Sequence, residues 1–204
     1  MYTKSILSIV AIATLSACGG SSTGPSSFTT AGTPPPAASN QAAFDERVSR
    51  GLALVDKYED ASVTAVMPTS GSASYSGLAG FSDVRNFDVE DVLATADVSM
   101  TANFTAGGGT VSGDISNFLA INEDNTQIEA YSGSLQISGG TIIGSNLVAN
   151  VGGTLVDPEG AFSVTGNMQG EFLGAGAEAL RAEMELLDTE DNEQFYGLLI
   201  AERN

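Results

Sequence analysis

Three clusters of acidic side chains come closest to forming a chemical site in this sequence. They are Asp88-Val89-Glu90-Asp91, Glu123-Asp124-Asn125 and Asp188-Thr189-Glu190-Asp191-Asn192-Glu193. Calcium needs six or more oxygen ligands at fixed geometry, and none of the clusters has the spaced acids and central glycine of a calcium-binding loop. Asp and Asn are also common turn residues. We therefore interpret the clusters as solvated turns and expect no metal site.

Catalytic residues are equally hard to find. The chain has no histidine, which excludes a Ser-His-Asp triad, a histidine-ligated zinc site and a histidine-bound haem. Tyrosine can ligate haem, but we interpret Tyr75 and Tyr131 as aromatic side chains that fill or rim the fold. Paired carboxylates for glycoside hydrolysis need a cleft, and nothing in the sequence indicates one. We expect no catalytic residue, no cofactor and no enzymatic activity.

The single cysteine, Cys18, follows an export signal. After a weakly basic start, Ser5 to Leu15 form an apolar run that is too short for a permanent membrane span and typical of a signal peptide. Leu15-Ser16-Ala17-Cys18 resembles the bacterial lipobox, in which cleavage precedes a cysteine whose thiol carries diacylglycerol. A lone cysteine cannot form an internal disulfide. We predict a lipoprotein signal peptide over residues 1–17 and lipid attachment at Cys18, with an ordinary secreted protein as the alternative.

A tether and a helix are expected next. Residues 18–40 contain the lipidated cysteine and a segment, Gly19 to Asn40, that has no charge and only one large apolar residue, Phe28, so we predict a disordered tether. Residues 41–62 read as an amphipathic helix that packs on the following domain, with a partner-binding helix as the alternative. Its expected apolar face carries Phe44, Val48, Leu52, Val55 and Tyr58, and the opposite side carries Asp45, Glu46, Arg47 and Lys57.

Residues 63–204 switch to a period of two, which is typical of strands. The clearest case is Leu93 to Phe104, where alternate residues are apolar and polar. We predict eight strands over 72–80, 93–104, 110–120, 127–137, 145–156, 161–173, 182–188 and 194–203. Eight antiparallel strands without crossover helices favour an all-β, up-and-down barrel, because closure removes exposed edges. A β-sandwich is the alternative.

Small residues on the inward face support the barrel. Ala73, Gly77 and Ala79 share one face with the rings of Tyr75 and Phe81. An eight-stranded barrel has an interior barely wide enough for side chains, so some strands must present small residues inward. The outward faces carry Asp97, Ser99, Asn103, Asn167, Gln169 and Glu171, which lipid would reject, so we disfavour a transmembrane barrel.

The charge is strongly acidic, with 25 acidic and 7 basic residues and a formal net charge of −18. Such a chain repels nucleic acid and anionic lipid headgroups and favours cationic partners or simply solubility. We expect no nucleic-acid partner.

The last forty residues contain three segments in a fixed order, GNMQGEFLG, then GAGAEALRAEMEL, which reads as a tight connection into another strand, and finally FYGLLIAERN. This order resembles the β-barrel domain of transferrin-binding protein B and its lipoprotein relatives. Those barrels close with a Gly-x-Phe-x-Gly-x-Phe-type strand, a Gly-Pro-x-Ala-x-x-Leu-Gly-like turn and a final Gly…Ala-x-Arg strand. The opening MPTSGSASYSG and the central GGGTVSGDISNF are similar to segments of small relatives, so the resemblance covers Met67 to Asn204. Ala175 stands where proline is expected, and Arg181-Ala182 stand where glycine is usual. The positions that match the closing motifs are Gly166, Gly170, Phe172, Gly174, Ala177, Leu180, Gly197, Ala201 and Arg203.

The resemblance implies a non-enzymatic binding protein, anchored to the outer membrane through Cys18 and facing either the cell surface or the periplasm. The full transferrin receptor has two lobes, each with a separate handle region that supports contact with the partner. This chain has room for one barrel and no handle region, so the resemblance does not imply that it binds transferrin. We expect a monomer that binds an extracellular protein or nutrient carrier through its loops, including Asn122–Asn125 and Asp188–Glu193. The alternatives are a lipocalin-like carrier of a small apolar ligand, which a barrel plugged by Phe104, Met168 and Phe172 would exclude, and a structural envelope lipoprotein.

Overall fold

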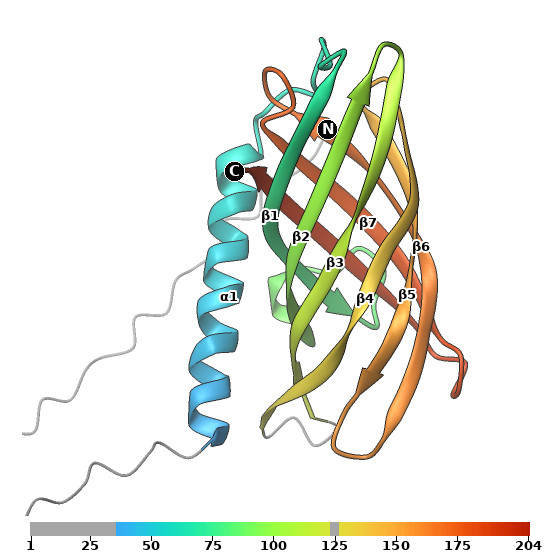
Figure 1. Ribbon diagram of the computed structural model, residues 1–204. Helices are drawn as coiled ribbons and strands as arrows, with labels where there is room; N and C mark the ends of the chain where they lie inside the picture. The colour runs from blue at the N-terminus through green and yellow to red at the C-terminus, as the bar shows by residue number, and fades with distance from the viewer. Residues whose placement is uncertain (1–35, 123–126) are drawn as a thin grey trace, which may run out of the picture. The chain divides into compact units, whose positions relative to one another are not determined.

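The computed structural model describes residues 36–122 and 127–204. One long helix precedes eight strands and a short 3-10 helix (Figure 1). The elements are α1 (Pro36–Tyr58), β1 (Gly71–Ser82), η1 (Val89–Asp91), β2 (Ala94–Thr105), β3 (Gly108–Ile121), β4 (Ile128–Ile143), β5 (Asn146–Val156), β6 (Ala161–Leu173), β7 (Ala179–Asp188) and β8 (Gln194–Arg203).

The strands form a closed barrel in which each strand is antiparallel to its neighbours in the sequence, and β8 returns to pair with β1. The register of closure is set by Gly77 opposite Ala201 and Phe81 opposite Gly197. All eight predicted strands are present, and the all-β barrel expected from the sequence is confirmed. A sandwich is thereby excluded.

Four strands, the first, third, fourth and seventh, are longer than the sequence predicts, and the fourth and seventh extend furthest at one end. The fourth continues past Ile137 to Ile143, because Gly139, with a φ of 62°, lies at a shift of register and not in a turn that ends the strand. Such bulges bend a strand without terminating it. The seventh begins at Ala179, directly after the tight turn that contains Ala177 at a φ of 64°.

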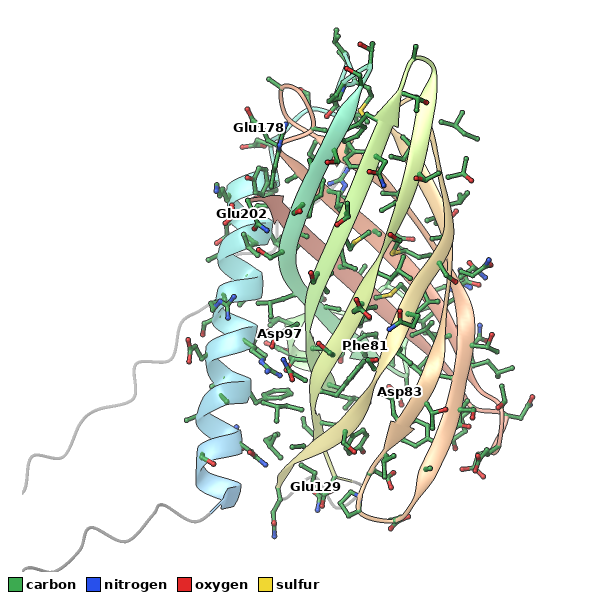
Figure 2. All side chains as sticks on the ribbon, in the orientation of Figure 1. Phe81, Asp83, Asp97, Glu129, Glu178 and Glu202 are labelled. Carbon is green, nitrogen blue, oxygen red and sulfur yellow. The ribbon has the colours of Figure 1, made fainter. Side chains whose placement is uncertain are left out.

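The interior is filled by alternating inward side chains. Ala73, Ala79, Tyr75 and Phe81 all lie in the core, as the alternation of β1 predicts, and Figure 2 shows Phe81 inside the barrel. The ring of Tyr75 lies 5.8 Å from the ring of Phe172, centroid to centroid. Phe104, Met168 and Phe172 are all buried in the same cluster. The small residues therefore make room for a few large ones in a narrow barrel.

Gly77 shows how tightly the closing strands approach. A Cβ added at Gly77 would lie 2.0 Å from the carbonyl oxygen of Ile200 and 2.5 Å from the Cα of Ala201. Both atoms belong to backbone, which cannot rotate away as a side chain does. Only glycine fits at this point of the seam between β1 and β8.

Helix α1 differs from its prediction at its start, at its end, which is Tyr58 and not residue 62, and on its faces. It begins at Pro36, inside the segment predicted to be tether. Proline is common in the first turn of a helix, because its missing N–H has no intrahelical partner there anyway. Phe44 is buried as expected, but Leu52 and Val55 are 42% and 50% exposed, and Arg47 points to the barrel and not to the solvent side. The helix thus does not lie on the barrel along its whole predicted face.

Candidate functional site

Two of the three segments named as sites by sequence lie wholly or partly outside the described residues. Cys18 is one, so its lipidation stays a prediction. Of the predicted loop Asn122–Asn125 only Asn122 is described, and its side-chain oxygen accepts a hydrogen bond from the backbone N–H of Gln127 at 3.1 Å. The loop Asp188–Glu193 is described completely and connects β7 to β8.

The up-and-down topology brings the acidic loops to one end of the barrel, which we call the acidic end. The connections β1–β2, β3–β4, β5–β6 and β7–β8 all lie there, whereas β2–β3, β4–β5 and β6–β7 lie at the other end. Three of these connections supply the described acids of the acidic end: Asp83, Asp88, Glu90, Asp91, Asp157, Glu159, Asp188, Glu190, Asp191 and Glu193. In the β2–β3, β4–β5 and β6–β7 turns, all of which are described, the only acid is Glu178.

Several of these carboxylates hold their own turns in shape. Asp157 Oδ1 accepts the backbone N–H groups of Glu159 and Gly160, both at 2.8 Å. Asp188 Oδ1 accepts the N–H of Glu190 at 2.8 Å. This is ordinary turn chemistry. Among the residues that the structure describes, no three metal-ligating side chains gather at one point.

A cavity of about 880 Å³ lies outside the barrel, between α1 and the strands. One wall is the segment of α1 from Arg47 to Tyr58 together with Glu59, which follows the helix, and another is the β1–β2 connection around Phe87 and Val92. The floor is the outer face of β1, β8, β7, β6 and β5. We call this cavity the helix groove. Pockets of this volume are large enough for a drug-sized ligand or part of a partner protein.

The floor of the helix groove consists of two adjacent cross-strand rows of outward side chains. One row runs Gly80, Leu198, Glu183, Gln169 and Val148, each opposite the next in the ladder. The other row runs Leu78, Ile200, Arg181, Glu171 and Asn146. The rows are apolar on β1 and β8 and polar or charged on β7 and β6, and they end on β5 in Val148 and Asn146. The groove therefore has an apolar half next to α1 and a charged half over β7 and β6.

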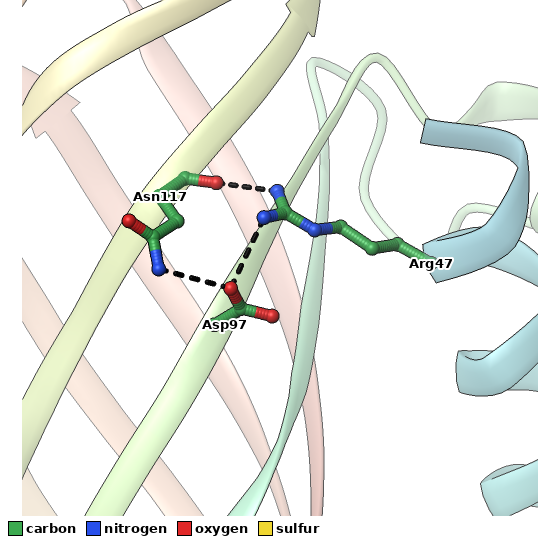
Figure 3. Close-up of polar contacts among 3 residues, drawn as sticks. All are labelled: Arg47, Asp97 and Asn117. Atoms are coloured by element: carbon green, nitrogen blue, oxygen red, sulfur yellow. Dashed lines mark hydrogen bonds and ion pairs between the residues drawn. The ribbon is translucent and has the colours of Figure 1, made fainter. Parts of the chain in front are cut away.

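The first half of α1 is fastened by a charged and an apolar contact. Figure 3 shows Arg47, whose guanidinium lies 3.0 Å from Asp97 Oδ2 and also donates to the backbone carbonyl of Asn117. The amide of Asn117 donates to the same carboxylate oxygen at 3.0 Å. Asn117 adopts a φ of 58° at an irregularity of β3, a conformation that asparagine tolerates. Nearby, Phe44 packs against Leu119 and Ile128.

The second half of α1 is fastened next to the end of β8. Lys57 Nζ lies 2.5 Å from Glu202 Oε2, and the hydroxyl of Tyr58 donates to the same oxygen at 3.3 Å. The hydrogen bond from Lys57 lowers the pKa of Glu202, and the same bond raises the pKa of Lys57. Leu54 and Tyr58 pack against a second apolar cluster that includes Leu173. The helix is therefore held at both ends, and Leu52 and Val55 between them remain exposed in the groove.

Thr95 lies at the edge of the groove floor and is 4% exposed. Its hydroxyl oxygen is buried and has no hydrogen-bond partner among the described residues. An unpaired buried hydroxyl reduces the stability of the folded state.

The tyrosines weighed as haem ligands have structural partners. Tyr75 is fully buried, and its hydroxyl donates to the backbone carbonyl of Ala177 at 2.8 Å. Burial raises the pKa of Tyr75 to about 12, because the phenolate would lose its hydration. The ring of Tyr131 packs edge-on against Phe162 at 6.0 Å. Both fill the fold, as the sequence predicts.

Sequence reasoning did not find the helix groove. A signal was present, because Leu78, Leu198 and Ile200 stand on outward positions where the barrel pattern calls for polar residues.

In the described part of the chain, no helix combines the length and hydropathy of a membrane span.

Comparison with known proteins identifies the barrel. A family model described as the C-lobe and N-lobe β-barrels of Tf-binding protein B matches residues 67–203, which is more than half of the chain. These residues contain all eight strands. No curated protein matches the chain significantly.

Proposed function

The chain belongs to the family of transferrin-binding protein B β-barrels, and from this premise we propose that it is a non-enzymatic binding protein, anchored by lipid to the bacterial outer membrane. Its partner is an extracellular protein or nutrient carrier. The proposal treats the barrel as a rigid scaffold whose outer surfaces make the contacts.

The observation that carries this proposal is the contrast between the inside and the outside of the barrel. Phe104, Met168 and Phe172 fill the interior, so a lipocalin-like ligand has no support there. The helix groove and the acidic end both lie on the outside. A scaffold of this kind favours recognition on its surface over enclosure of a small molecule.

The anchoring part of the proposal rests on Leu15-Ser16-Ala17-Cys18 and the uncharged residues that follow. Two or more acyl chains hold a protein stably in a bilayer. The residues between Cys18 and α1 would then act as the tether between the lipid and the folded part.

Lipid labelling and protease treatment of intact cells test the anchoring. The wild-type protein should incorporate labelled palmitate, and the Cys18→Ala variant should not. If the protein is displayed outside, protease added to intact cells removes the barrel, whereas display toward the periplasm leaves it intact. Equal labelling of both variants would contradict the anchor.

Binding is tested with the purified protein. Wild-type protein, immobilised through a C-terminal tag, should retain a partner from the growth environment that the isolated helix and tether do not retain. A variant with Asp188→Asn, Glu190→Gln, Asp191→Asn and Glu193→Gln measures the part played by the acidic end. If the wild-type protein retains nothing specific under any condition in which the gene is expressed, the binding function is wrong.

A further inference from the structure

The helix groove has the chemistry of a docking site for a cationic, amphipathic segment of a partner protein, and we propose that it binds one. This inference rests on the proposed binding function and names the part of the surface and the chemistry of the partner. It concerns the groove and not the acidic loops.

The apolar half of the groove provides an anchor point. Leu52 and Val55 on α1 and Leu198 on β8 are 42%, 50% and 42% exposed, and all three line the same cavity. Large apolar side chains exposed together mark an interaction surface more often than isolated ones do. Apolar side chains of a partner placed between α1 and β8 would contact this part of the groove.

The charged half of the groove determines which sign of charge a partner must carry. Four carboxylates line the groove, on Glu59, Asp88, Glu171 and Glu183, against two guanidinium groups, on Arg47 and Arg181. Both guanidinium groups are already paired, because Arg47 contacts Asp97 at 3.0 Å and Arg181 contacts Glu171 at 2.6 Å.

Three acids in the groove are left without such a pair. Glu59, Asp88 and Glu183 have no ion pair with any described residue. A lysine or arginine of a partner would supply what they lack, and a partner of opposite charge associates faster and more selectively. An anionic amphiphile such as a fatty acid would instead meet unpaired carboxylates.

The dimensions suit a short helix. The floor crosses from β1 to β5, which is four strand spacings of about 4.8 Å, or roughly 19 Å. A helix of about 13 residues has that length. Helices that dock in grooves do so with apolar residues at i, i+3 or i+4, and i+7.

Other occupants fit less well. A second copy of this chain also carries a net charge of −18, so two copies repel each other. The segment from Gly19 to Pro35 of the same chain has no charged residue and only one large apolar residue, Phe28, so it offers nothing to Glu59 or Glu183.

The test uses a designed peptide of about 14 residues with leucines on one helical face and lysines flanking it. Its control replaces every lysine by glutamate. Binding to the purified mature chain is measured by fluorescence anisotropy of the labelled peptide, at low and at high salt. The expected result is binding of the lysine peptide that weakens with salt, and at least about tenfold weaker binding of the glutamate peptide.

Variants locate the binding. Leu198→Asp on β8 and Val55→Asp on α1 change exposed positions of the groove from two different elements, and each should weaken the lysine peptide about tenfold. The matched control is Val156→Asp, because Val156 is 40% exposed and does not line the groove. It should bind within about twofold of the wild-type chain.

Two charge-reversal variants, one inside and one outside the groove, complete the set. Glu183→Lys should weaken the peptide several-fold, and Glu193→Lys in the β7–β8 turn makes the same charge change outside the groove and should not. Thermal melts of each variant confirm that it is folded before binding is compared.

Several results would overturn the inference. They are no binding of the lysine peptide, equal binding of the two peptides, and binding that falls equally in the groove variants and their controls, which would mean unspecific attraction to an acidic protein. Binding of palmitate that Leu198→Asp abolishes, without peptide binding, would assign the groove to a small apolar ligand instead. A natural partner that binds the groove variants as tightly as the wild-type chain would overturn the groove inference and leave the proposed function standing.

Discussion

The buried phenol of Tyr75 makes a prediction about stability at alkaline pH. Its side chain is fully buried, its hydroxyl donates to the carbonyl of Ala177, and its pKa is raised from 10.0 to about 12. In the unfolded chain the phenol loses its proton near the ordinary value, whereas in the folded chain it keeps it. The folded state therefore binds more protons between about pH 10 and about pH 12, and stability falls as the pH rises through that window.

The size of the effect follows from the shift. A raised pKa of about two pH units corresponds to roughly 3 kcal/mol, which is fully present below pH 10 and lost above about pH 12. Tyr75→Phe removes the ionisable group but leaves the buried carbonyl of Ala177 without its donor, which costs about 1 kcal/mol at neutral pH. The wild-type chain should therefore be more stable at neutral pH, and the variant more stable above about pH 11.

Urea denaturation followed by far-ultraviolet circular dichroism, repeated from neutral pH to beyond pH 11, measures both curves. Since the other tyrosines are common to both chains, the difference between the curves isolates Tyr75. Curves that stay parallel over the whole range would refute the reasoning, because they would mean that Tyr75 titrates alike in the folded and the unfolded chain.

Three further sets of substitutions test the packing and the fastening of the helix. Gly77→Ala should destabilise the barrel by about 1–3 kcal/mol because its methyl group meets the backbone of β8, while Gly160→Ala, which meets nothing within 4 Å, should leave the melting temperature unchanged; equal shifts would contradict the close seam. Thr95→Val should raise stability by about 1 kcal/mol by removing an unpaired buried hydroxyl, and a loss in the melt would mean that the hydroxyl has a partner. Arg47→Ala and Asp97→Ala, measured alone and together, should show a coupling in the free energy of unfolding of about 1 kcal/mol or less that shrinks in salt. Hydrogen exchange in α1 should be faster in these variants. A coupling of zero would mean that this pair does not fasten the helix.

The strands could be predicted from the sequence because a half-buried strand repeats every two residues, and this chain keeps that period over most of each strand, with shifts only where β2, β3 and β4 bulge. In β1, Ala73, Tyr75, Ala79 and Phe81 all lie inside as the alternation indicates. The closure of the sheet into a barrel could also be predicted, because the inward positions of the alternating pattern carry small residues, and small inward residues suit a narrow barrel.

Boundaries and bulges were less predictable. Gly139-Gly140 resembles a turn in sequence, yet the strand continues through it as a bulge, because Gly140 pairs with Val111 on β3 and pairing with β5 resumes at Thr141. The ladder of a neighbour is tertiary information, which local sequence does not contain.

The helix groove could not be predicted because it depends on where α1 lies on the barrel. Leu52 and Val55 are apolar residues at helical spacing, and from sequence they read as buried. The pairing of Arg47 with Asp97, fifty positions away, fixes the helix in an orientation that leaves them exposed. Long-range pairs of this kind leave no periodic signal.

Site-specific photocrosslinking in living cells tests the central claim, that this barrel binds a partner protein on its outside through the helix groove. A photoreactive amino acid is placed at Val55, at Leu198 or, as the control, at Val156. The account predicts a discrete protein adduct from the two groove positions, absent from position 156 and reduced when the lysine peptide is added before irradiation. The same adduct from all three positions, or no adduct from either groove position, would contradict it.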